Sequence, residues 1–276
     1  MALDSTPRGP RLIGRYVLLA VVAFFVLFPV YTMVVASLKP GNKALRTPLR
    51  PSNFTFETLT DAWGSGHLGR YMLNSIVVAV VVTVAQVVTS VLAAYAFAFL
   101  QFPFKRVVFA VFLATLLVPA EVTLLVNRRT VDSLGWINTY RGLTVPFLAS
   151  AFGIFLLRQV FLSLPPEMRE AASMDGVGHL GFLREVAVPM ARPSLGALAL
   201  FSFLGSWNQY LWPTLVTTEQ DMNTVQSGLR QLSKNNIDAP NAIMAGTLIA
   251  AVPIVAVLLV FQRQLVRGLT AGAVKG

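Results

Sequence analysis

The sequence predicts an all-α protein that crosses a membrane several times. Of its 276 residues 55% are hydrophobic, whereas only 12% are charged, which is far from the balance of a water-soluble domain. The charged residues also cluster between long apolar runs. One aqueous core could not bury so much apolar surface, so we expect lipid to cover the remainder.

Six apolar runs approach the roughly 20 residues that a helix needs to cross a bilayer. The first follows the basic cluster at residues 8–15 and ends before Lys39. It has no cleavage site of a secretory signal, so we expect it to be a retained anchor. The predicted spans cover residues 16–38, 71–100, 107–126, 143–157, 194–216 and 242–261.

Three of these runs have features that bear on their geometry. The second is longer than the hydrocarbon core requires, so its helix must tilt or project from the membrane. The third contains Pro119, which can open a bend, and the ionisable residue Glu121. The fourth is short, so its helix could begin earlier or lie partly outside the hydrocarbon.

The orientation follows from the basic residues beside the spans. An even number of spans places both termini on one side, which would hold twelve of the 22 basic residues. Basic residues directly beside spans weigh most in the positive-inside rule, so we predict cytoplasmic N- and C-termini. The clusters that favour this side are Arg11/Arg15, Lys105/Arg106 and Arg263/Arg267.

Several function classes are not expected. The net charge is +10, but no basic stripe with interleaved aromatic residues indicates a nucleic-acid partner. With no cysteine and only His67 and His179, we expect no metal site. The serines lack the histidine and acid of a hydrolase, so we predict no catalytic residues. No phosphate-cradling G-x-x-x-x-G-K-[ST] loop occurs, so we expect no nucleotide site in this chain.

The segment of residues 158–193 is long for a connection between two spans, which suggests a built structure with a task. Proline is tolerated in a first helical turn and glycine suits a helix end, so Pro165-Pro166 and Gly176 predict a short helix between them. One face of this helix has two methyl-sized side chains at its centre, which would let another protein's backbone approach closely. That face comprises Met168, Ala171, Ala172 and Asp175.

A second short helix is predicted at residues 179–188, before Pro189. Phe182, Leu183 and Val186 recur there at helical spacing. Two rods joined at a glycine could act as a rigid handle on the fourth and fifth spans. A plain surface hairpin fits the periodicity equally well.

The stretch Glu170–Gly176 reads Glu-Ala-Ala-Ser-Met-Asp-Gly, and Pro189 and Pro193 follow it. This pattern resembles the EAA loop of ATP-binding-cassette (ABC) importer permeases, in which a hydrophobic helix and a Pro-x-x-x-Pro exit follow the glycine. Similarity to the maltose-permease type extends from Asn74-Ser75 to the tail at residues 268–276. The resemblance implies a single transmembrane permease domain over residues 1–276, with a cytoplasmic EAA coupling-helix loop at 158–193.

The resemblance also implies partners and a substrate. In such importers a heterodimer of homologous permeases in the bacterial inner membrane works with an extracytoplasmic substrate-binding protein and with two ATPases that bind ATP and Mg. The motifs Trp207–Pro213 and Val118–Val122 look most like the permeases of glycerol-3-phosphate importers, which implies sn-glycerol-3-phosphate or a glycerophosphodiester. The alternatives are a neutral sugar or oligosaccharide and, in a different class, an ion-coupled secondary transporter or channel.

Two sets of site residues follow. The resemblance assigns the contact with the ATPase to one short stretch. This set consists of Glu170, Ala171, Ala172, Asp175 and Gly176. For the substrate path, polar groups and flat aromatic surfaces in the fifth span suit a sugar or polyol, although they could instead be interfacial anchors. This second set consists of Trp207, Asn208, Gln209 and Tyr210.

Glu121 is a further candidate for the substrate path. An ionisable group within a span usually faces a cavity or a partner, which here could be a substrate hydroxyl, Arg128 or Arg129. The alternative is that the helix ends near Pro119 and that Glu121 is wet at the outer boundary. A carboxylate would also repel a phosphate, so an anionic substrate would need basic partners that outweigh it.

Overall fold

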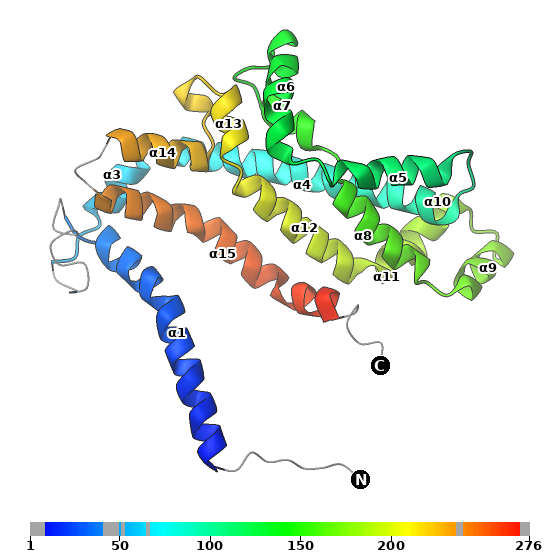
Figure 1. The fold of residues 1–276 in the computed structure, drawn as a ribbon, viewed down its shortest axis with the longest axis horizontal. Coiled ribbons are helices and arrows are strands. Elements are labelled where there is room, and N and C mark those ends of the chain that lie inside the picture. Colours follow the sequence, from blue (N-terminus) through cyan, green and yellow to red (C-terminus); the bar gives the residue numbers. More distant parts are fainter. Residues whose placement is uncertain (1–8, 41–49, 51–52, 65–66, 236–239, 271–276) are drawn as a thin grey trace. The chain divides into compact units, whose positions relative to one another are not determined.

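The computed structural model describes residues 9–40, 50, 53–64, 67–235 and 240–270, and the regular elements in these ranges are all helices (Figure 1). Three of the helices are long and apolar enough to cross a membrane, or up to five if each of two bent pairs forms one span. The tail motif noted above ends in residues 271–276, which lie outside the described ranges. The chain divides into two compact units, one from residues 1–68 and 229–251 and one from 69–228 and 252–276.

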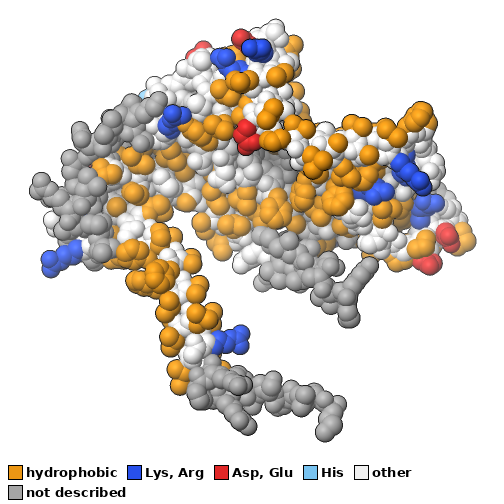
Figure 2. Space-filling model, viewed as in Figure 1, with side chains coloured by type: hydrophobic (Ala, Val, Ile, Leu, Met, Phe, Trp, Pro, Cys, Tyr) orange, Lys and Arg blue, Asp and Glu red, His pale blue; other side chains and the backbone are white. Residues whose placement is uncertain are grey.

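The first unit contains most of the N-terminal part of the chain. Helix α1 covers Gly9–Ser37, and α3 covers Glu57–Trp63. The backbone carbonyl of Lys39 ties the unit together, because it accepts hydrogen bonds from the Thr58 hydroxyl at 3.0 Å and from the Asn241 side-chain amide at 2.8 Å. Apolar side chains cover α1, which is a candidate span over Leu12–Ser37 with no buried residue in its most apolar window (Figure 2). Its surface is therefore suited to lipid.

The second unit is organised along α4, which covers Leu68–Phe99 and is the longest helix of the unit. The C-terminal helix α15 covers Pro240–Thr270. The other regular elements are α5 (Lys105–Thr115), α6 (Ala120–Ser133), α7 (Tyr140–Thr144), η1 (Val145–Phe147), α8 (Ala151–Leu162), α9 (Pro166–Met174), α10 (His179–Phe182), η2 (Leu183–Ala187), α11 (Val188–Met190), α12 (Arg192–Trp207), α13 (Leu211–Val216), η3 (Gln220–Met222) and α14 (Val225–Asn235).

Three of the six predicted spans are single long helices. Helices α1, α4 and α15 cover the runs 16–38, 71–100 and 242–261 almost completely. The fourth apolar run lies in a pair of helical segments that starts at Tyr140, before the run itself, and the two segments bend by 43°. Ser150 caps the second half, since its hydroxyl accepts the backbone N–H of Gly153 at 3.1 Å.

The runs 107–126 and 194–216 are each divided between two helices, and a proline lies near each break. The sequence predicted a possible bend at Pro119, whereas it did not predict the break in the fifth run. Helix α5 ends at Thr115 and α6 begins after Pro119, which lacks the N–H that a continuous helix would bond to the carbonyl of Thr115. Helix α12 ends at Trp207, and α13 begins at Leu211. Pro213 lies in the first turn of α13, where its missing N–H breaks no helical hydrogen bond.

Candidate functional site

Helix α9 forms because its sequence supplies both ends. It begins at Pro166, has Glu167 in the first turn and ends at Met174, as predicted. Gly176 adopts a positive φ of 75°. The N–H of Val177 bonds to the carbonyl of Ala172 at 2.8 Å and that of Gly176 bonds to Ser173 at 3.2 Å. These two bonds make a Schellman motif, so Gly176 is the helix stop that the sequence predicted.

The predicted single face of α9 is divided between two environments. Met168 and Ala172, four residues apart, are half-buried, and Ala172 packs against the core below. Ala171 and Asp175, also four apart, are exposed. The stripe of Met168 and Ala172 therefore packs the helix against the protein, because an isolated helix of this length is not stable. The neighbouring stripe of Ala171 and Asp175 is exposed, and Met174 beside it is 83% exposed.

The segment that follows α9 is one irregular rod from His179 to Met190. Phe182 and Leu183 are buried and Val186 is half-buried, as their spacing predicted. The prediction that Pro189 ends this helix is wrong: the rod passes through a π-helical turn at Leu183–Ala187 and continues to Met190. The rod and α12 then meet at an angle of 78°.

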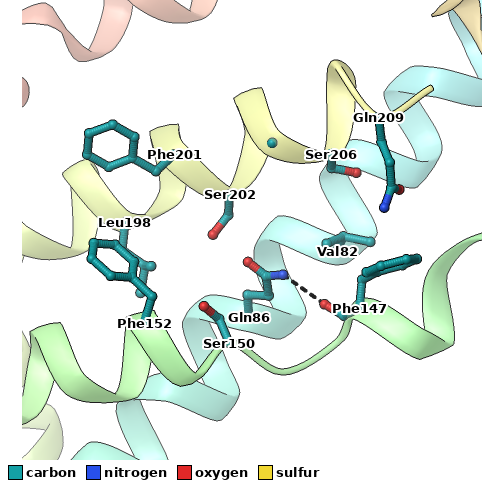
Figure 3. A pocket seen from close by; sticks show the side chains of 11 residues that line it. Val82, Gln86, Phe147, Ser150, Phe152, Leu198, Phe201, Ser202, Ser206 and Gln209 are labelled. Atoms are coloured by element: carbon teal, nitrogen blue, oxygen red, sulfur yellow. Dashed lines mark hydrogen bonds between the residues drawn. The ribbon is translucent and has the colours of Figure 1, made fainter. Parts of the chain in front are cut away.

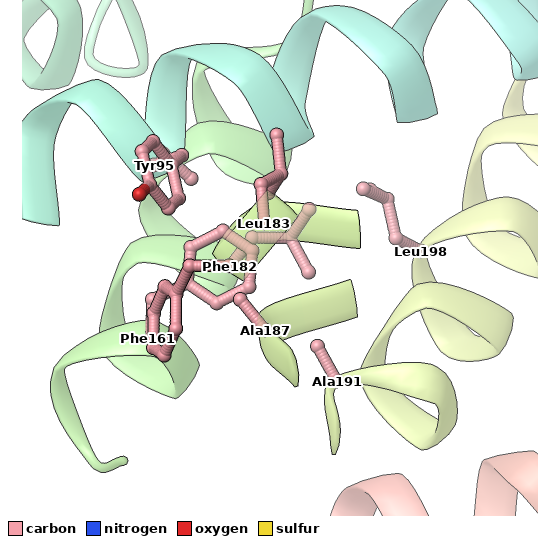
Figure 4. Packing of buried hydrophobic residues seen from close by; sticks show 9 residues of the cluster. Tyr95, Phe161, Phe182, Leu183, Ala187, Ala191 and Leu198 are labelled. Atoms are coloured by element: carbon pink, nitrogen blue, oxygen red, sulfur yellow. The ribbon is translucent and has the colours of Figure 1, made fainter. Parts of the chain in front are cut away.

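A core cluster joins this rod to α4, α8 and α12. Tyr95, Phe161, Phe182, Leu183 and Leu198 converge in it (Figure 4). The rings of Phe99 and Phe182 meet edge to face at 5.6 Å, and the hydroxyl of Tyr95 lies 3.0 Å from Nδ1 of His179. Packed rings with a hydrogen bond at their edge resist relative motion. The rod is therefore packed directly against α4.

Two cationic side chains donate hydrogen bonds to backbone carbonyls at the C-terminal end of α4. The ammonium group of Lys105 donates to the carbonyl of Leu100 at 2.7 Å, and Nε of Arg158 donates to that of Phe97 at 3.3 Å. Cations suit the negative end of a helix dipole. Burial lowers the pKa of Lys105, and the positive charge of Arg158 lowers it further. Figure 2 shows charged side chains of both signs gathered toward the end that holds α9.

The other end of α4 holds a polar network, of which Asn74 is the centre. Asn74 is fully buried and its amide donates to the carbonyls of Asp221 at 2.7 Å and Asn223 at 2.9 Å. Its side-chain oxygen accepts the hydroxyl of Tyr140 at 2.7 Å. The hydroxyl of Ser75 accepts the first N–H of α14 at 2.8 Å, from Val225. The network therefore fixes the Thr217–Val225 segment on α4.

The residues predicted for the substrate path do not form one cluster. The ring of Trp207 is 1% exposed and stacks on Phe203 with centroids 5.6 Å apart, so it faces protein in this conformation. Asn208 is exposed at the end of α12, and Tyr210 precedes α13. Glu121 is exposed in the first turn of α6. Their roles in the path stay predictions.

Gln209 is the one predicted path residue that lines a cavity described here. The cavity has a volume of about 180 Å³ and lies among α4, the start of α8 and α12. Figure 3 shows Gln86, Ser150 and Ser202 pointing into the space between these helices. Ser202 and Ser206 were not predicted from the sequence as site residues. Small hydroxyl residues four apart in an apolar helix are a weak signal, because they also serve helix packing.

The fold and these sites define a class of membrane transport protein. Residues 86–271 match the family described as the binding-protein-dependent transport system inner membrane component, and the chain belongs to this family. A crystal structure of a bacterial ABC transporter involved in the import of the acidic polysaccharide alginate has the same fold. Its TM-score is 0.81 at 23% identity, with 93% of this chain and 98% of that chain covered.

Relatives with higher identity come from glycerol-3-phosphate transport systems. The chain is 34% identical to the sn-glycerol-3-phosphate transport system permease protein UgpE of Yersinia enterocolitica, over 92% of this chain and 94% of that protein. It is 37% identical to the UgpE protein of Rhizobium meliloti, over 94% of this chain and 95% of that protein. The resemblance to ABC importer permeases is thereby confirmed.

Proposed function

We propose that this chain is a permease subunit of an ATP-driven importer for sn-glycerol-3-phosphate or a glycerophosphodiester. The observation that carries the proposal is the identity of 34–37% with UgpE proteins over more than nine-tenths of the chain. Relatives at this identity and coverage share the fold along almost the whole chain, whereas the substrate class is inferred from them. ATP and Mg belong to partner ATPases in this proposal, and the permease itself is not catalytic.

The proposed assembly contains a homologous permease, two ATPases and an extracytoplasmic binding protein. The family description, which names binding-protein-dependent transport, supports the last of these. In the assembly the exposed stripe of α9 docks on an ATPase through Glu170, Ala171 and Asp175, while Ala172 and Gly176 hold the helix in shape. Met174, which lies beside these residues and is 83% exposed, adds an apolar side chain to the stripe.

We further propose that six segments span the membrane, with both termini in the cytoplasm. In this arrangement α5 and α6 make one span that is broken around Pro119, and α12 and α13 make another that is broken around Asn208. Broken helices are tolerated at membrane depth where their free backbone groups face protein or a water-filled path. The cations Lys105 and Arg158 at one end of α4 support the cytoplasmic placement of that end.

A neutral sugar or polyol is the second candidate substrate. The residues that line the cavity among α4, α8 and α12 carry no formal charge. A cavity that bound the phosphate itself would need cations to replace the lost hydration. The lining therefore favours either a neutral ligand or the neutral part of a charged one.

Uptake into proteoliposomes that hold the complete complex tests the proposal. We expect labelled glycerol-3-phosphate to accumulate only with internal ATP and with the binding protein outside. Accumulation driven by an ion gradient without ATP would instead identify a secondary transporter. Uptake of neutral sugars in place of the phosphate ester would select the second candidate.

Charge reversal on α9 tests the coupling role. We expect Glu170→Lys to lower both ATPase retention and coupled uptake, because Glu170 lies on the exposed side of the helix. Glu219→Lys is the matched control, since Glu219 is also exposed but lies on a segment remote in sequence. If both variants behave alike, α9 is not the ATPase contact.

A further inference from the structure

Three basic side chains gather where α4 ends and α5 begins. Lys105 and Arg106 are the first two residues of α5, and Arg158 lies in α8, which packs against α5. The guanidinium carbon of Arg158 lies 4.3 Å from the ring centre of Phe109, and its Nε donates to the carbonyl of Phe97 at 3.3 Å. These two contacts hold Arg158 close enough to Lys105 for their charges to repel each other.

A cluster of four rings supports this arrangement. The ring of Phe97 packs against those of Phe102, Phe109 and Phe112, with centroids between 5.2 and 5.8 Å apart. Packed rings of this kind resist displacement. Arg158 is half-buried against the cluster. Its charged group is therefore held by protein contacts, unlike that of an arginine on an open surface.

The basic cluster has no compensating carboxylate among the described residues. Lys105 donates only to the backbone carbonyls of Leu100 at 2.7 Å and Ala98 at 3.5 Å. The two terminal nitrogens of Arg158 have no hydrogen-bond partner in the described part of the chain. Burial lowers the pKa of Lys105 and the charge of Arg158 lowers it further, so the cation is disfavoured there. A bound anion would offset both effects.

Apolar side chains beside the cluster face outward. Phe104 directly precedes Lys105, is 77% exposed and has a positive φ of 58°, which is rare for a bulky residue. Val107 and Val111 are four residues apart on α5, hence on one face, and are 60% and 61% exposed. Helix α5 belongs to one of the apolar runs that approach the length of a span. This face is therefore suited to acyl chains.

We propose that the basic cluster binds the headgroup phosphate of an anionic phospholipid whose acyl chains lie along the exposed face of α5. Phosphate oxygens accept from the terminal nitrogens of Arg158 and from Lys105 or Arg106, and the ring of Phe104 enters the interfacial layer. The ends of membrane helices lie at headgroup level, where lipid phosphate is far more concentrated than a soluble anion. This favours a lipid over free phosphate. The proposal is independent of the transported substrate.

Lipid titration of the purified full-length chain in detergent, followed by native mass spectrometry, tests the site. We expect phosphatidylglycerol to bind more tightly than phosphatidylcholine. Arg158→Gln should weaken only the binding of phosphatidylglycerol, by about fivefold for the lost cation. Arg158→Lys should keep most of the affinity, because the charge stays. Arg184→Gln is the matched control, since Arg184 is exposed on η2 and makes no cation–ring contact among the described residues.

A second variant and a soluble anion separate the alternatives. If Arg158→Gln does not purify as a folded protein, Arg106→Gln gives the same comparison, because Arg106 is exposed and its loss breaks no contact among the described residues. Inorganic phosphate should not displace the bound phosphatidylglycerol. Equal affinities for the two lipids, or an equal loss in Arg184→Gln, would overturn the site. Displacement by inorganic phosphate would overturn the assignment to a lipid.

Discussion

The hydroxyl of Tyr95 lies 3.0 Å from Nδ1 of His179, and this contact joins the last turns of α4 to the first residue of α10. The two residues are 84 positions apart in the sequence. Around them the rings of Phe99, Phe161 and Phe182 approach Tyr95 with centroids between 5.1 and 6.5 Å away. A push on α9 would thus reach α4 through packed rings and one polar contact.

Tyr95→Phe should weaken this connection without removing the ring. We expect the ratio of substrate transported to ATP hydrolysed to fall by about two- to tenfold, since one hydrogen bond is lost. Assembly with the ATPases should be unchanged. The measurement is paired uptake and phosphate release in proteoliposomes, with Tyr16→Phe on the exposed surface of α1 as the control. An unaltered ratio would show that the contact only stabilises the fold.

Gly176→Val should disrupt the end of α9. Gly176 has a φ of 75°, which a β-branched side chain adopts only with a cost of about 1–2 kcal/mol. We expect reduced ATP-coupled uptake, measured at equal expression. Gly178→Ala is the control, because Gly178 has a φ of −73° and an added Cβ would meet nothing within 4 Å. Equal losses in both variants would contradict a specific need for the left-handed turn.

Asn74→Leu should lower the stability of the second unit. It removes three hydrogen bonds from a fully buried site. We expect a loss of about 2–4 kcal/mol, seen as a lower thermal transition of the purified protein in detergent. Tyr140→Phe removes only one of the bonds and should cost about 1 kcal/mol. Similar transitions for both variants would argue against the network.

Gly153→Ala should clash where α8 crosses α4. An added Cβ would collide with the Ser90 hydroxyl oxygen and lie 3.1 Å from two methyl groups of Leu198. We expect a loss of about 1–3 kcal/mol from overpacking. The double variant with Ser90→Ala should recover part of that loss, because the colliding oxygen is absent. Failure of the second change to help would place the strain at Leu198 instead.

Sequence patterns predicted the long helices and the shape of α9 because those features are local. Apolar runs between charged clusters correspond to α1, α4 and α15, and Gly176 sets the helix end through its own backbone conformation. The coupling and path residues were selected from the resemblance and from residue chemistry, and α9 displays three of them on its open side.

The breaks in the third and fifth apolar runs were harder to predict than the long helices, because apolar composition does not indicate where a backbone hydrogen bond is missing. Pro119 was recognised as a possible bend, whereas Pro213 was not. The burial of Trp207 depends on stacking with Phe203 and on helix positions, which periodicity alone does not give. The cavity likewise needs three segments that are distant in sequence to converge.

The most direct test of the coupling role of α9 uses single cysteines, since the chain has none of its own. Met174 and Leu134 have side chains that are 83% and 52% exposed, and the proposed topology puts them on opposite sides of the membrane. We predict that Met174→Cys cross-links to an ATPase subunit and that only Leu134→Cys reacts with an impermeant reagent added outside whole cells. Labelling of Met174→Cys from outside, with no cross-link to the ATPase, would contradict the account.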